Sequence, residues 1–411
     1  MAVVLGRLLA LAFLICFGTG LYSHFLQDPL PWMHFATRPA RLYQLTQGIH
    51  ITAGIACFPL LLGKLFAVFP NLFTFPPITG FVNLLERASI ALFVASSLLQ
   101  ITTGLLDTFQ WYPFPFNFRQ THFALSFVII GSLAIHIAVK LPLITRYWTH
   151  AASFDADGEL ALDAEDRALT HADVAADLKA NRKLEPVGPI SRRTDGLTGR
   201  VMDWIDSAPP REPKVSRRGF VATIGVATAA VIALTAGQSF GFLDKINVLA
   251  PRKKGIGPNK LPINRTARAA QVTAALVGAD WQLILSNGDK STGFTRAQLL
   301  RMPQTTVELP ISCVEGWSQQ ATWRGVRLKD LLKEVDVAEG DNLRVTSLEV
   351  KGGYRVMDMG HEYVQDPLTL VALELNGATL DLDHGYPARM IAPGRPGVLQ
   401  TKWLSSIEVR A

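Results

Sequence analysis

The stretch VSRRGFVATIGVATAAVIALTAG, residues 215–237, separates two unlike parts of the chain. It begins with two arginines close to Phe220 and continues as an uncharged apolar run. This pattern is typical of an export signal, although here it lies at mid-chain. Apolar residues crowd into the first 150 positions, whereas residues 245–411 have the mixed composition of a soluble domain. The stretch therefore predicts a membrane part before it and an exported part after it.

Four other runs are long enough to cross a bilayer, which takes about 20 apolar residues. They are Val3–Phe25, Leu42–Phe69, Ala88–Trp111 and His122–Thr145, and Phe220–Phe242 is a fifth. The first run also fits a cleavable signal peptide, but three more spans follow it, so we interpret it as an anchor. We therefore expect an all-α transmembrane bundle of four helices and a fifth helix that acts as a tether.

Lysine and arginine are distributed unevenly around these runs, and cytoplasmic loops carry the larger share of such residues. With the N-terminus in the cytoplasm, the inner side receives Arg7, Lys64, Arg87, Lys140, Arg146, Arg211, Lys214, Arg217 and Arg218, and the outer side receives Arg38, Arg41 and Arg119. Four crossings then return the chain to the cytoplasm. The fifth run delivers the C-terminal part to the extracytoplasmic face.

These observations predict four regions. Residues 1–147 form the membrane bundle, 148–214 a cytoplasmic linker, 215–243 the signal and fifth helix, and 245–411 the exported domain. The linker begins with the acidic segment FDADGELALDAED and ends rich in proline and arginine, as expected of a solvated connector. The net charge is a modest +6, and no basic stripe with interleaved aromatics is present, so we expect no nucleic-acid partner.

The segment SRRGF, residues 216–220, resembles the twin-arginine export signature, and the Ala/Thr/Gly-rich run after it fits that resemblance. The twin-arginine export machinery carries proteins already folded around a cofactor, so the resemblance implies that a cofactor is loaded before export. An ordinary positive-inside anchor that contains Arg-Arg is the alternative. No clean A-x-A cleavage site follows. We therefore expect the segment to remain as a helix in a bacterial plasma membrane, among its lipids.

Three histidines fall within the predicted spans: His50 in the second, and His122 and His136 in the fourth. Ionisable residues at membrane depth are costly and usually functional. His122 and His136 are almost four helical turns apart, so both face one side at a separation of about 21 Å. This spacing suits two haems stacked across a membrane. Hydrogen-bonded polar residues in a haem-free bundle are the alternative.

The histidine arrangement resembles dihaem b-type cytochromes, especially the four-helix cytochrome subunit of respiratory formate dehydrogenases. The resemblance implies that His50 and His122 bind the iron of an outer haem b, with quinone or quinol as the membrane redox partner. It also implies a second haem b on His136. The first helix, however, has no histidine near its cytoplasmic end, and His24 lies at the opposite end. We therefore expect one haem b and leave the second open.

Residues 245–411 predict a mixed α+β domain. Alternating runs predict strands at 281–288 (WQLILSNG), 305–314 (TTVELPISCV), 342–350 (NLRVTSLEV), 368–377 (LTLVALELNG) and 402–409 (KWLSSIEV). Short helices are expected in FTRAQLLRM, residues 294–302, and RLKDLLKEV, residues 327–335. Thr292 or Thr295 is expected to cap the first of them.

The chain has three cysteines, and they cannot supply a disulfide framework. Cys16 and Cys57 lie in apolar runs, whereas Cys313 is the only cysteine of the exported domain and follows a predicted strand. A lone cysteine of this kind is either inert core or a functional thiolate. Cys313 lies in ISCVEGWSQQATWRGVRLKDLL, residues 311–332, and a second marked segment is LELNGATLDLDHGYPARMIAPGRPGVLQTKWLSSIEV, residues 373–409.

Together these two segments resemble the molybdopterin domain of the sulfite oxidase superfamily, in particular the bacterial periplasmic branch that includes the molybdenum-type methionine-sulfoxide reductase. The resemblance covers roughly residues 260–411. It implies a Mo-molybdopterin cofactor, with Cys313 as the catalytic metal ligand, because a soft thiolate suits molybdenum beside the dithiolene sulfurs. It also implies pterin or phosphate contacts from Asn264, Ser347, His384, Arg389, Thr401 and Lys402.

The residues after Cys313 bear on the substrate. Sulfite oxidases follow their ligand cysteine with an Asn-Arg-Arg-type sequence that helps to build a cationic pocket, whereas VEGWSQQ has an acid and no base. This difference favours a neutral small-molecule substrate such as a sulfoxide or an N-oxide, although Arg324, Arg327 and Arg355 could reach the pocket.

We therefore expect a membrane-bound enzyme that passes electrons between the quinone pool, haem b and an exported molybdenum site that performs oxygen-atom transfer. The alternatives are oxidation of sulfite or another small molecule, with electrons delivered to quinone, and a non-catalytic membrane electron relay.

Overall fold

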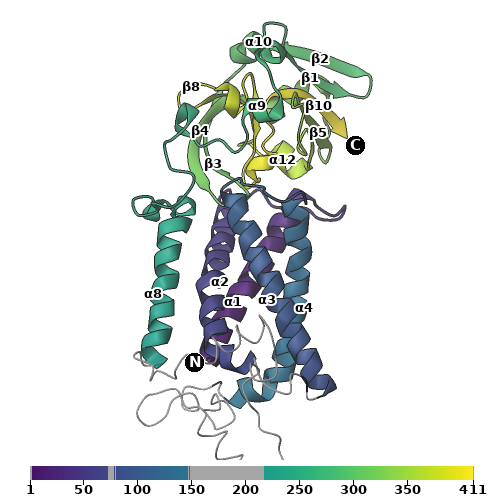
Figure 1. The fold of residues 1–411 in the computed structure, drawn as a ribbon. Helices are drawn as coiled ribbons and strands as arrows, with labels where there is room; N and C mark the ends of the chain where they lie inside the picture. Colours follow the sequence, from purple (N-terminus) through teal and green to yellow (C-terminus); the bar gives the residue numbers. More distant parts are fainter. Residues whose placement is uncertain (1, 73–77, 79, 147, 149–216, 411) are drawn as a thin grey trace, which may run out of the picture. The chain divides into compact units, whose positions relative to one another are not determined.

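The computed structural model describes residues 2–72, 78, 80–146, 148 and 217–410 (Figure 1). The chain divides into two compact units. The helical unit contains Met1–Leu14, Gly54–Gly104 and Phe116–Ala230, and the sheet unit contains Ile15–Ala53, Leu105–Pro115 and Val231–Ala411. Apart from Trp148, the predicted linker 148–214 lies outside the described residues, as do the first two residues of the predicted signal.

Among the described residues, five helices are long and apolar enough to cross a membrane. They are α1 (Ala2–Gln27), α2 (Leu42–Leu72), α3 (Phe81–Thr108), α4 (Phe118–Arg146) and α8 (Arg217–Thr235). The five predicted apolar spans are therefore confirmed as helices. α3 begins at Phe81 rather than at Ala88, and α8 ends at Thr235 rather than at Phe242. Short 3-10 turns follow Thr235, because the glycines of AGQSFGF disfavour a continued helix.

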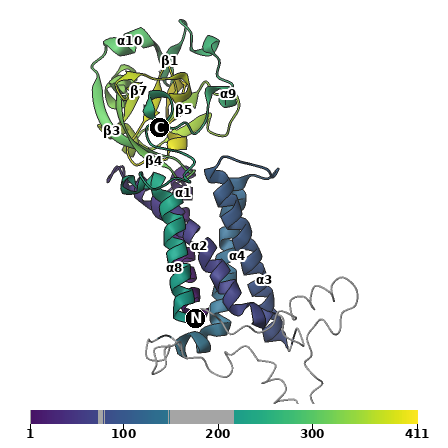
Figure 2. The ribbon, with the colours of Figure 1, turned by 60° about the vertical axis from the view of Figure 1, so that its left-hand side comes forward.

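Helices α1 to α4 pack against one another within the helical unit (Figures 1 and 2). All four contribute buried apolar side chains, for example Leu9, Leu61, Phe93 and Leu133. The rings of Phe13 and Phe93 meet edge to face, with centroids 5.3 Å apart. Only 17–39% of the most apolar window of each of these helices is buried, which suits helices whose outer faces contact lipid.

The sheet unit contains two five-stranded sheets. The first has the order β2-β1-β10-β5-β6, and the second runs β3-β4-β7-β8, with β9 also paired to β7. The strands are β1 (Gln282–Asn287), β2 (Lys290–Thr295), β3 (Thr305–Ser312), β4 (Ser318–Arg327), β5 (Asn342–Ser347), β6 (Val356–Met359), β7 (Leu370–Leu375), β8 (Ala378–Thr379), β9 (Arg389–Ile391) and β10 (Leu404–Arg410). The β1–β10 pairing is parallel, and the other pairings are antiparallel.

All five predicted strands are present, as β1, β3, β5, β7 and β10, so the mixed α+β expectation is confirmed. The predicted helices are present as α10 (Arg296–Arg301) and α11 (Leu328–Leu331), with a 3-10 turn after α11. Thr295, rather than Thr292, caps α10. Its side chain accepts from the Gln298 N–H, and the Gln298 side chain bonds back to the Thr295 backbone, which forms a capping box.

Three apolar clusters lie in the sheet unit, and the two larger ones surround the strands. The larger packs Leu283, Leu285, Leu343 and Ile407 of the first sheet with neighbouring helices. The second surrounds Trp323 in the second sheet and includes Cys313 and Trp317. Because Trp317 is 1% exposed, it belongs to this core. The second cluster therefore fixes the surroundings of Cys313.

Candidate active site

Cys313 lies one residue beyond the end of β3, in the tight turn that leads to β4. The Cys313 N–H donates to the Trp317 carbonyl at 2.8 Å, and the Gly316 N–H donates to the Cys313 carbonyl at 3.1 Å. Gly316 has a φ of +92°, and a Cβ there would lie 2.6 Å from Ile51 Cγ1. A glycine is therefore required at this position. We call residues 313–317 the cysteine turn.

The Cys313 side chain is buried, with 1% exposure. Burial, and secondarily the charge of Glu315, raises the pKa of this thiol well above its usual value. A buried, protonated thiol is a poor nucleophile, whereas coordination to a metal would remove its proton. The position therefore suits a metal ligand better than a nucleophile that works in open solvent.

Arg389 lies on β9 as a buried cation with 1% exposure. Its Nη1 donates to the His384 carbonyl at 3.3 Å, but Nε and Nη2 have no hydrogen-bond partner among the described residues. Burial lowers the pKa of Arg389 to about 9, while the charge of Cys313 acts in the opposite direction. Buried donors without acceptors are costly, so this guanidinium has the chemistry of an anion site.

Thr401 and Lys402 adjoin Arg389, because the N–H of Met390 donates to the Thr401 carbonyl at 2.9 Å. Thr401 Oγ1 is buried and has no partner among the described residues. Lys402 Nζ donates to the carbonyls of Arg265 at 2.8 Å and Asp383 at 2.7 Å. Burial, followed by the charge of Arg389, holds the pKa of Lys402 well below its usual value. The three predicted contacts therefore gather in one buried cationic region.

His384 lies in the same region, with Nε2 2.8 Å from the Pro258 carbonyl and 3.1 Å from the Leu261 carbonyl. Burial, with the charges of Arg389 and Lys402, lowers the pKa of His384 to about 4. The imidazole is therefore neutral at pH 7, with its proton on Nε2. It would offer a bound pterin an acceptor at Nδ1 rather than a positive charge.

The other two predicted contacts bind neighbouring backbone. Ser347 Oγ donates to the Lys402 carbonyl at 2.7 Å and accepts from the Glu349 N–H at 3.1 Å. Asn264 is half-buried, and its Oδ1 accepts from the Arg265 N–H at 2.9 Å. Ser347 thus positions the backbone of Lys402, and the cofactor roles of both residues remain predictions.

Arg395 is a similar residue that the sequence did not single out. It is 4% exposed, and burial lowers its pKa to about 10. Nη2 donates to the Asp358 carbonyl at 2.6 Å, while Nε and Nη1 lack partners within the described part of the chain. Its surroundings, APGRPG, indicate a loop, where an arginine is ordinarily exposed. The only sequence feature that points to Arg395 as a site residue is its position within residues 373–409, the second segment that resembles the molybdopterin domain.

Three successive residues of the cysteine turn accept hydrogen bonds from sequence-distant segments of the sheet unit. Gln47 of α2 donates to the Val314 carbonyl at 2.9 Å, Gln110 beyond α3 donates to Glu315 Oε1, and Ser239 beyond α8 donates to the Gly316 carbonyl. Burial raises the pKa of Glu315 to about 7, although hydrogen bonds from Gln110 and Trp317 oppose the shift. The turn that carries Cys313 is thus bound directly to α2 and to the segments that follow α3 and α8.

His50, a predicted haem ligand, belongs to the sheet unit. Its Nδ1 lies 3.0 Å from the Cys16 carbonyl and 3.1 Å from Thr19 Oγ1. A carbonyl can only accept, so the proton is assigned to Nδ1 and Nε2 is the nitrogen suited to iron. At Gly20 a Cβ would lie 3.1 Å from His50 Cε1, so glycine lets the ring approach α1 closely.

The other two predicted haem ligands, His122 and His136, lie on α4 in the helical unit. His122 Nδ1 is 3.5 Å from Thr103 Oγ1. His136 Nδ1 is buried without a hydrogen-bond partner among the described residues, as expected if a bound group satisfies this side chain. These are the only two histidines that the structure describes in the helical unit, and both lie on α4, so no other described helix of that unit offers His136 a histidine partner.

Residues 270–411 match the family described as "Oxidoreductase molybdopterin binding domain". The buried Cys313 and the unsatisfied donors of Arg389 and Thr401 fit that cofactor, which needs a thiolate and partners for its anionic groups. This part of the chain is therefore a molybdopterin-binding oxidoreductase domain, and it is similar to proteins of the sulfite oxidase superfamily.

Several relatives share this domain. Mitochondrial sulfite oxidase of Drosophila melanogaster is 28% identical, over 32% of this chain and 27% of its own length. The protein-methionine-sulfoxide reductase catalytic subunit MsrP of Gluconobacter oxydans (strain 621H) is 31% identical, over 27% and 41% of the two chains. NADH nitrate reductase of Spinacia oleracea is 37% identical, over 22% and 11%.

The crystal structure of the sulfane dehydrogenase SoxCD from Paracoccus pantotrophus is 28% identical, with a TM-score of 0.29, over 32% of this chain and 38% of that chain. The match spans less than half the length of each of these relatives.

Proposed function

We propose that this protein is a membrane-bound molybdenum-cofactor oxidoreductase. It exchanges electrons with the quinone pool through a b-type haem and acts on a small molecule at the extracytoplasmic face of a bacterial plasma membrane. The observation that carries this proposal is the pair of unsatisfied donors on buried Arg389, within a domain that also buries Cys313 and matches the molybdopterin family.

Each buried side chain has a role toward the cofactor. Cys313 would bind molybdenum through Sγ, and Arg389 and Thr401 would bind the pterin phosphate through Nε, Nη2 and Oγ1. Lys402 would add positive charge, and His384 would accept a hydrogen bond at Nδ1. When bound, the cofactor supplies two-electron oxygen-atom transfer, in which a sulfoxide takes up two electrons and two protons and yields the sulfide and one water.

A neutral sulfoxide or N-oxide is the substrate class that the site favours. The cysteine turn offers the acid Glu315 and no base, and Arg324, Arg327 and Arg355 all have exposed side chains. Arg324 is in addition paired with Glu374 at 2.8 Å. The similarity to a protein-methionine-sulfoxide reductase supports the same direction of reaction.

Oxidation of sulfite is the second candidate; sulfite and one water would give sulfate, two electrons and two protons. Arg395 supports it, because two of its buried donors lack partners among the described residues and could bind an anionic substrate. The similarity to sulfite oxidases supports it as well. In this case electrons would leave the site toward quinone.

The contact between Gln47 and Val314 supports electron exchange through haem. Gln47 and His50 both lie on α2, less than one helical turn apart, and the Gln47 amide touches the residue after Cys313. A haem held by His50 would therefore be close to the cysteine turn. His122 would hold the haem iron together with His50, as the resemblance to b-type cytochromes implies.

Metal and haem analysis of the purified full-length protein tests the proposal. We expect about one molybdenum per chain, lost in Cys313→Ser, with a b-type haem spectrum retained in both proteins. His50→Ala should show the reverse, with molybdenum retained and haem lost. Wild-type protein that contains no molybdenum when produced in a cofactor-competent host would refute the mechanism. Assays with sulfoxides and a quinol analogue, and with sulfite and a quinone analogue, then decide the direction.

Export by the twin-arginine machinery is tested separately through Arg217 and Arg218. Replacing both with lysine retains the positive charge of an ordinary anchor but removes the signature. We expect residues 245–411 of this variant to resist protease added to spheroplasts, whereas the wild-type domain is digested or released. Equal accessibility of the two proteins would identify an ordinary anchor instead.

A further inference from the structure

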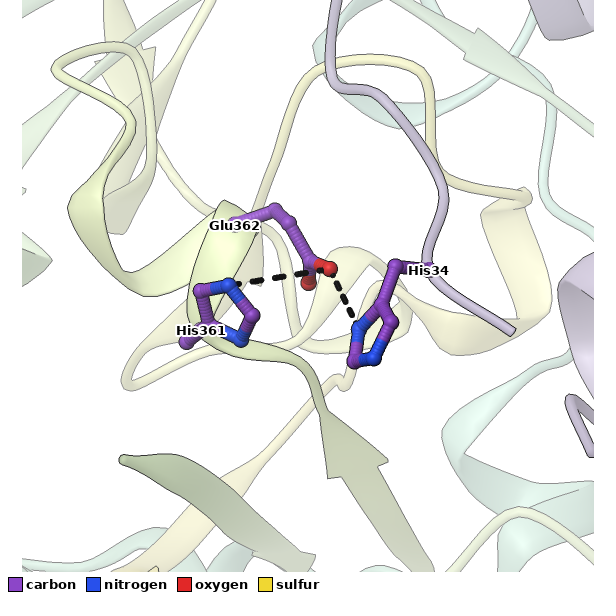
Figure 3. Close-up of side chains that lie close together, drawn as sticks. All are labelled: His34, His361 and Glu362. Atoms are coloured by element: carbon purple, nitrogen blue, oxygen red, sulfur yellow. Dashed lines mark ion pairs between the residues drawn. The ribbon is translucent and has the colours of Figure 1, made fainter. Parts of the chain in front are cut away.

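Two histidines and a glutamate from distant parts of the sequence meet on the surface of the sheet unit. His34 lies in the segment between α1 and α2, and His361 and Glu362 begin the short helix α12 (His361–Gln365). One ligand atom from each of the three lies within 4.8 Å of the other two. Figure 3 shows the two imidazoles on either side of the Glu362 carboxylate.

The contacts of this cluster leave the carboxylate without an ordinary donor. His34 Nδ1 is 2.7 Å from Glu362 Oε1, and His361 Nε2 is 3.9 Å from the same oxygen. Oε1 is nevertheless buried and has no partner with hydrogen-bond geometry among the described residues. A buried carboxylate oxygen in this state is costly, and either a protonated imidazole or a metal ion held between the three side chains would stabilise it.

The separations suit one small cation. Zinc binds histidine nitrogen and carboxylate oxygen at about 2.0–2.2 Å, so two ligands of a tetrahedral ion lie roughly 3.3 Å apart. The distances of 2.7 and 3.9 Å bracket that value, so small side-chain rotations would complete the geometry. The His34 side chain is 61% exposed, which leaves room for water as a fourth ligand.

The segment that carries His34 is held at this surface by two further contacts. Arg38 Nη2 pairs with Asp366 Oδ1, a buried carboxylate directly after α12, at 3.0 Å. The Gly394 N–H donates to the Ala40 carbonyl at 3.1 Å. These two contacts hold Arg38 and Ala40 near α12, and a metal ion bound by His34 would add a third attachment closer to α1.

We propose that His34, His361 and Glu362 form a zinc site that fastens the segment between α1 and α2 to α12 of the exported domain. Two imidazoles and one carboxylate form a ligand set that both zinc and iron(II) accept, whereas magnesium and calcium prefer oxygen ligands; we choose zinc because it remains divalent without a reductant. The ion links a segment that adjoins two apolar helices to the domain that carries Cys313. The site is separate from the molybdenum site, and the proposal does not depend on the redox function.

Zinc titration of the full-length, molybdenum-loaded protein tests the proposal. The protein carries an affinity tag without histidine, is stripped of loosely bound metal with a chelator, and then competes for zinc with a chromophoric indicator. We expect one site per chain. His34→Ala and His361→Ala each remove one of three protein ligands and should weaken the affinity by roughly 100-fold. Glu362→Gln should weaken it as well, because the carboxamide loses the charge.

Two matched variants identify the site. His24→Ala removes a histidine of α1 outside the cluster and should retain the zinc affinity. Cys313→Ser should retain it as well, since zinc that disappears with Cys313 would be bound at the molybdenum site and would overturn the proposal. Zinc binding that His34→Ala and His361→Ala leave unchanged would also overturn it.

Hydrogen exchange provides a second readout. Zinc should slow amide exchange in residues 28–41 of the wild-type protein and have no such effect in His361→Ala. If zinc changes exchange in neither protein, then the three side chains form an ion pair only and the metal site is refuted. Cobalt added in place of zinc should show visible d–d absorption in the wild type, and this absorption should be absent from His361→Ala.

Discussion

Gln47 Nε2 donates a 2.9 Å hydrogen bond to the backbone carbonyl of Val314, the residue that follows Cys313. Gln110 and Ser239 bind the next two residues of the cysteine turn. In a protein that passes electrons between haem and molybdenum, these bonds would fix the separation of the two centres. They would leave the chemistry at molybdenum untouched, because none of the three donors is a cofactor contact.

Gln47→Ala should therefore slow electron exchange while sparing the molybdenum chemistry. Loss of one such hydrogen bond corresponds to about 1 kcal/mol, and we expect quinol-dependent turnover to fall about fivefold. Turnover with reduced viologen, which delivers electrons directly to an exposed centre, should stay at the wild-type level. Gln320→Ala, on the exposed face of β4, is the matched control and should change neither rate. Equal losses in both assays for Gln47→Ala would place the defect at the molybdenum site itself.

Arg389→Met should have opposite effects on the cofactor-free and the loaded protein. Without cofactor, Arg389 is a buried cation with two donors that lack partners among the described residues, and an apolar side chain of similar length removes that cost. We expect the cofactor-free variant to gain about 2 kcal/mol in free energy of unfolding. Protein from a cofactor-competent host should, in contrast, contain at least about tenfold less molybdenum, because a bidentate phosphate contact is missing.

The stability of the cofactor-free variant is measured by denaturant unfolding of protein made in a host without the cofactor pathway. The molybdenum content is measured by metal analysis of protein made in a cofactor-competent host. Thr266→Val, at an exposed N-cap in the same domain, is the control, and its molybdenum content should be normal. A cofactor-free Arg389→Met protein that is less stable than the wild type would show that the guanidinium serves the fold rather than a ligand.

Gly385→Ala should release the cofactor by separating two of its expected contacts. Gly385 has a φ of +108°, and a Cβ there would lie 3.1 Å from Lys402 Cα and 3.3 Å from Arg389 Cβ. Gly340 has nearly the same conformation, with a φ of +105°, but a Cβ there meets nothing within 4 Å. Gly340→Ala should therefore show the backbone strain alone, of about 1–3 kcal/mol.

We expect molybdenum to be lost from Gly385→Ala and retained in Gly340→Ala, as measured by metal analysis alongside thermal unfolding. If both variants lose similar stability and both retain the metal, then the close packing of Gly385 against Lys402 does not shape the cofactor site.

The sequence predicts the apolar helices well, because a membrane span depends on length and composition alone. It also predicts the strands in which apolar and polar residues alternate. It does not predict β4, although Ala321 and Trp323 are buried there, because Gln319 and Gly325 occupy buried positions that an alternating strand fills with apolar side chains. The neighbouring strands β3 and β7, which pair with β4 on either side, override its weak local preference.

The site residues also differ in this way: the local sequence identifies some of them, and others are recognisable only in the folded chain. Motif position identified Cys313, Arg389 and Thr401 as candidates, but the unsatisfied atoms of Arg389 and Thr401 depend on burial that tertiary packing produces. Arg395 was missed for this reason, since a loop arginine is normally exposed. The meeting of His34 with α12 has no local signal either, because only the folded sheet unit brings those segments together.

His384 should make the stability of the cofactor-free protein depend on pH. Burial, and then the charges of Arg389 and Lys402, lower its pKa to about 4 from the ordinary value of 6.5. Below pH 6.5 the unfolded chain binds a proton at this residue, whereas the folded chain resists protonation until about pH 4. The folded state therefore loses stability as the pH falls through this window, by about 1.4 kcal/mol per pH unit and about 3 kcal/mol in total.

Denaturant unfolding of the cofactor-free full-length protein between pH 7.5 and 4 should reveal this loss, and His384→Gln should reduce the slope by about one proton. His361→Gln, measured with chelator present, is the comparison, because its side chain is 38% exposed and lies outside the buried cationic region. This variant shows how much a histidine-to-glutamine replacement outside that region changes the slope by itself. A His384→Gln protein whose stability falls as steeply as that of the wild type would mean that His384 takes up its proton at the same pH in the folded and unfolded chains, and the lowered pKa of the folded state would then be wrong.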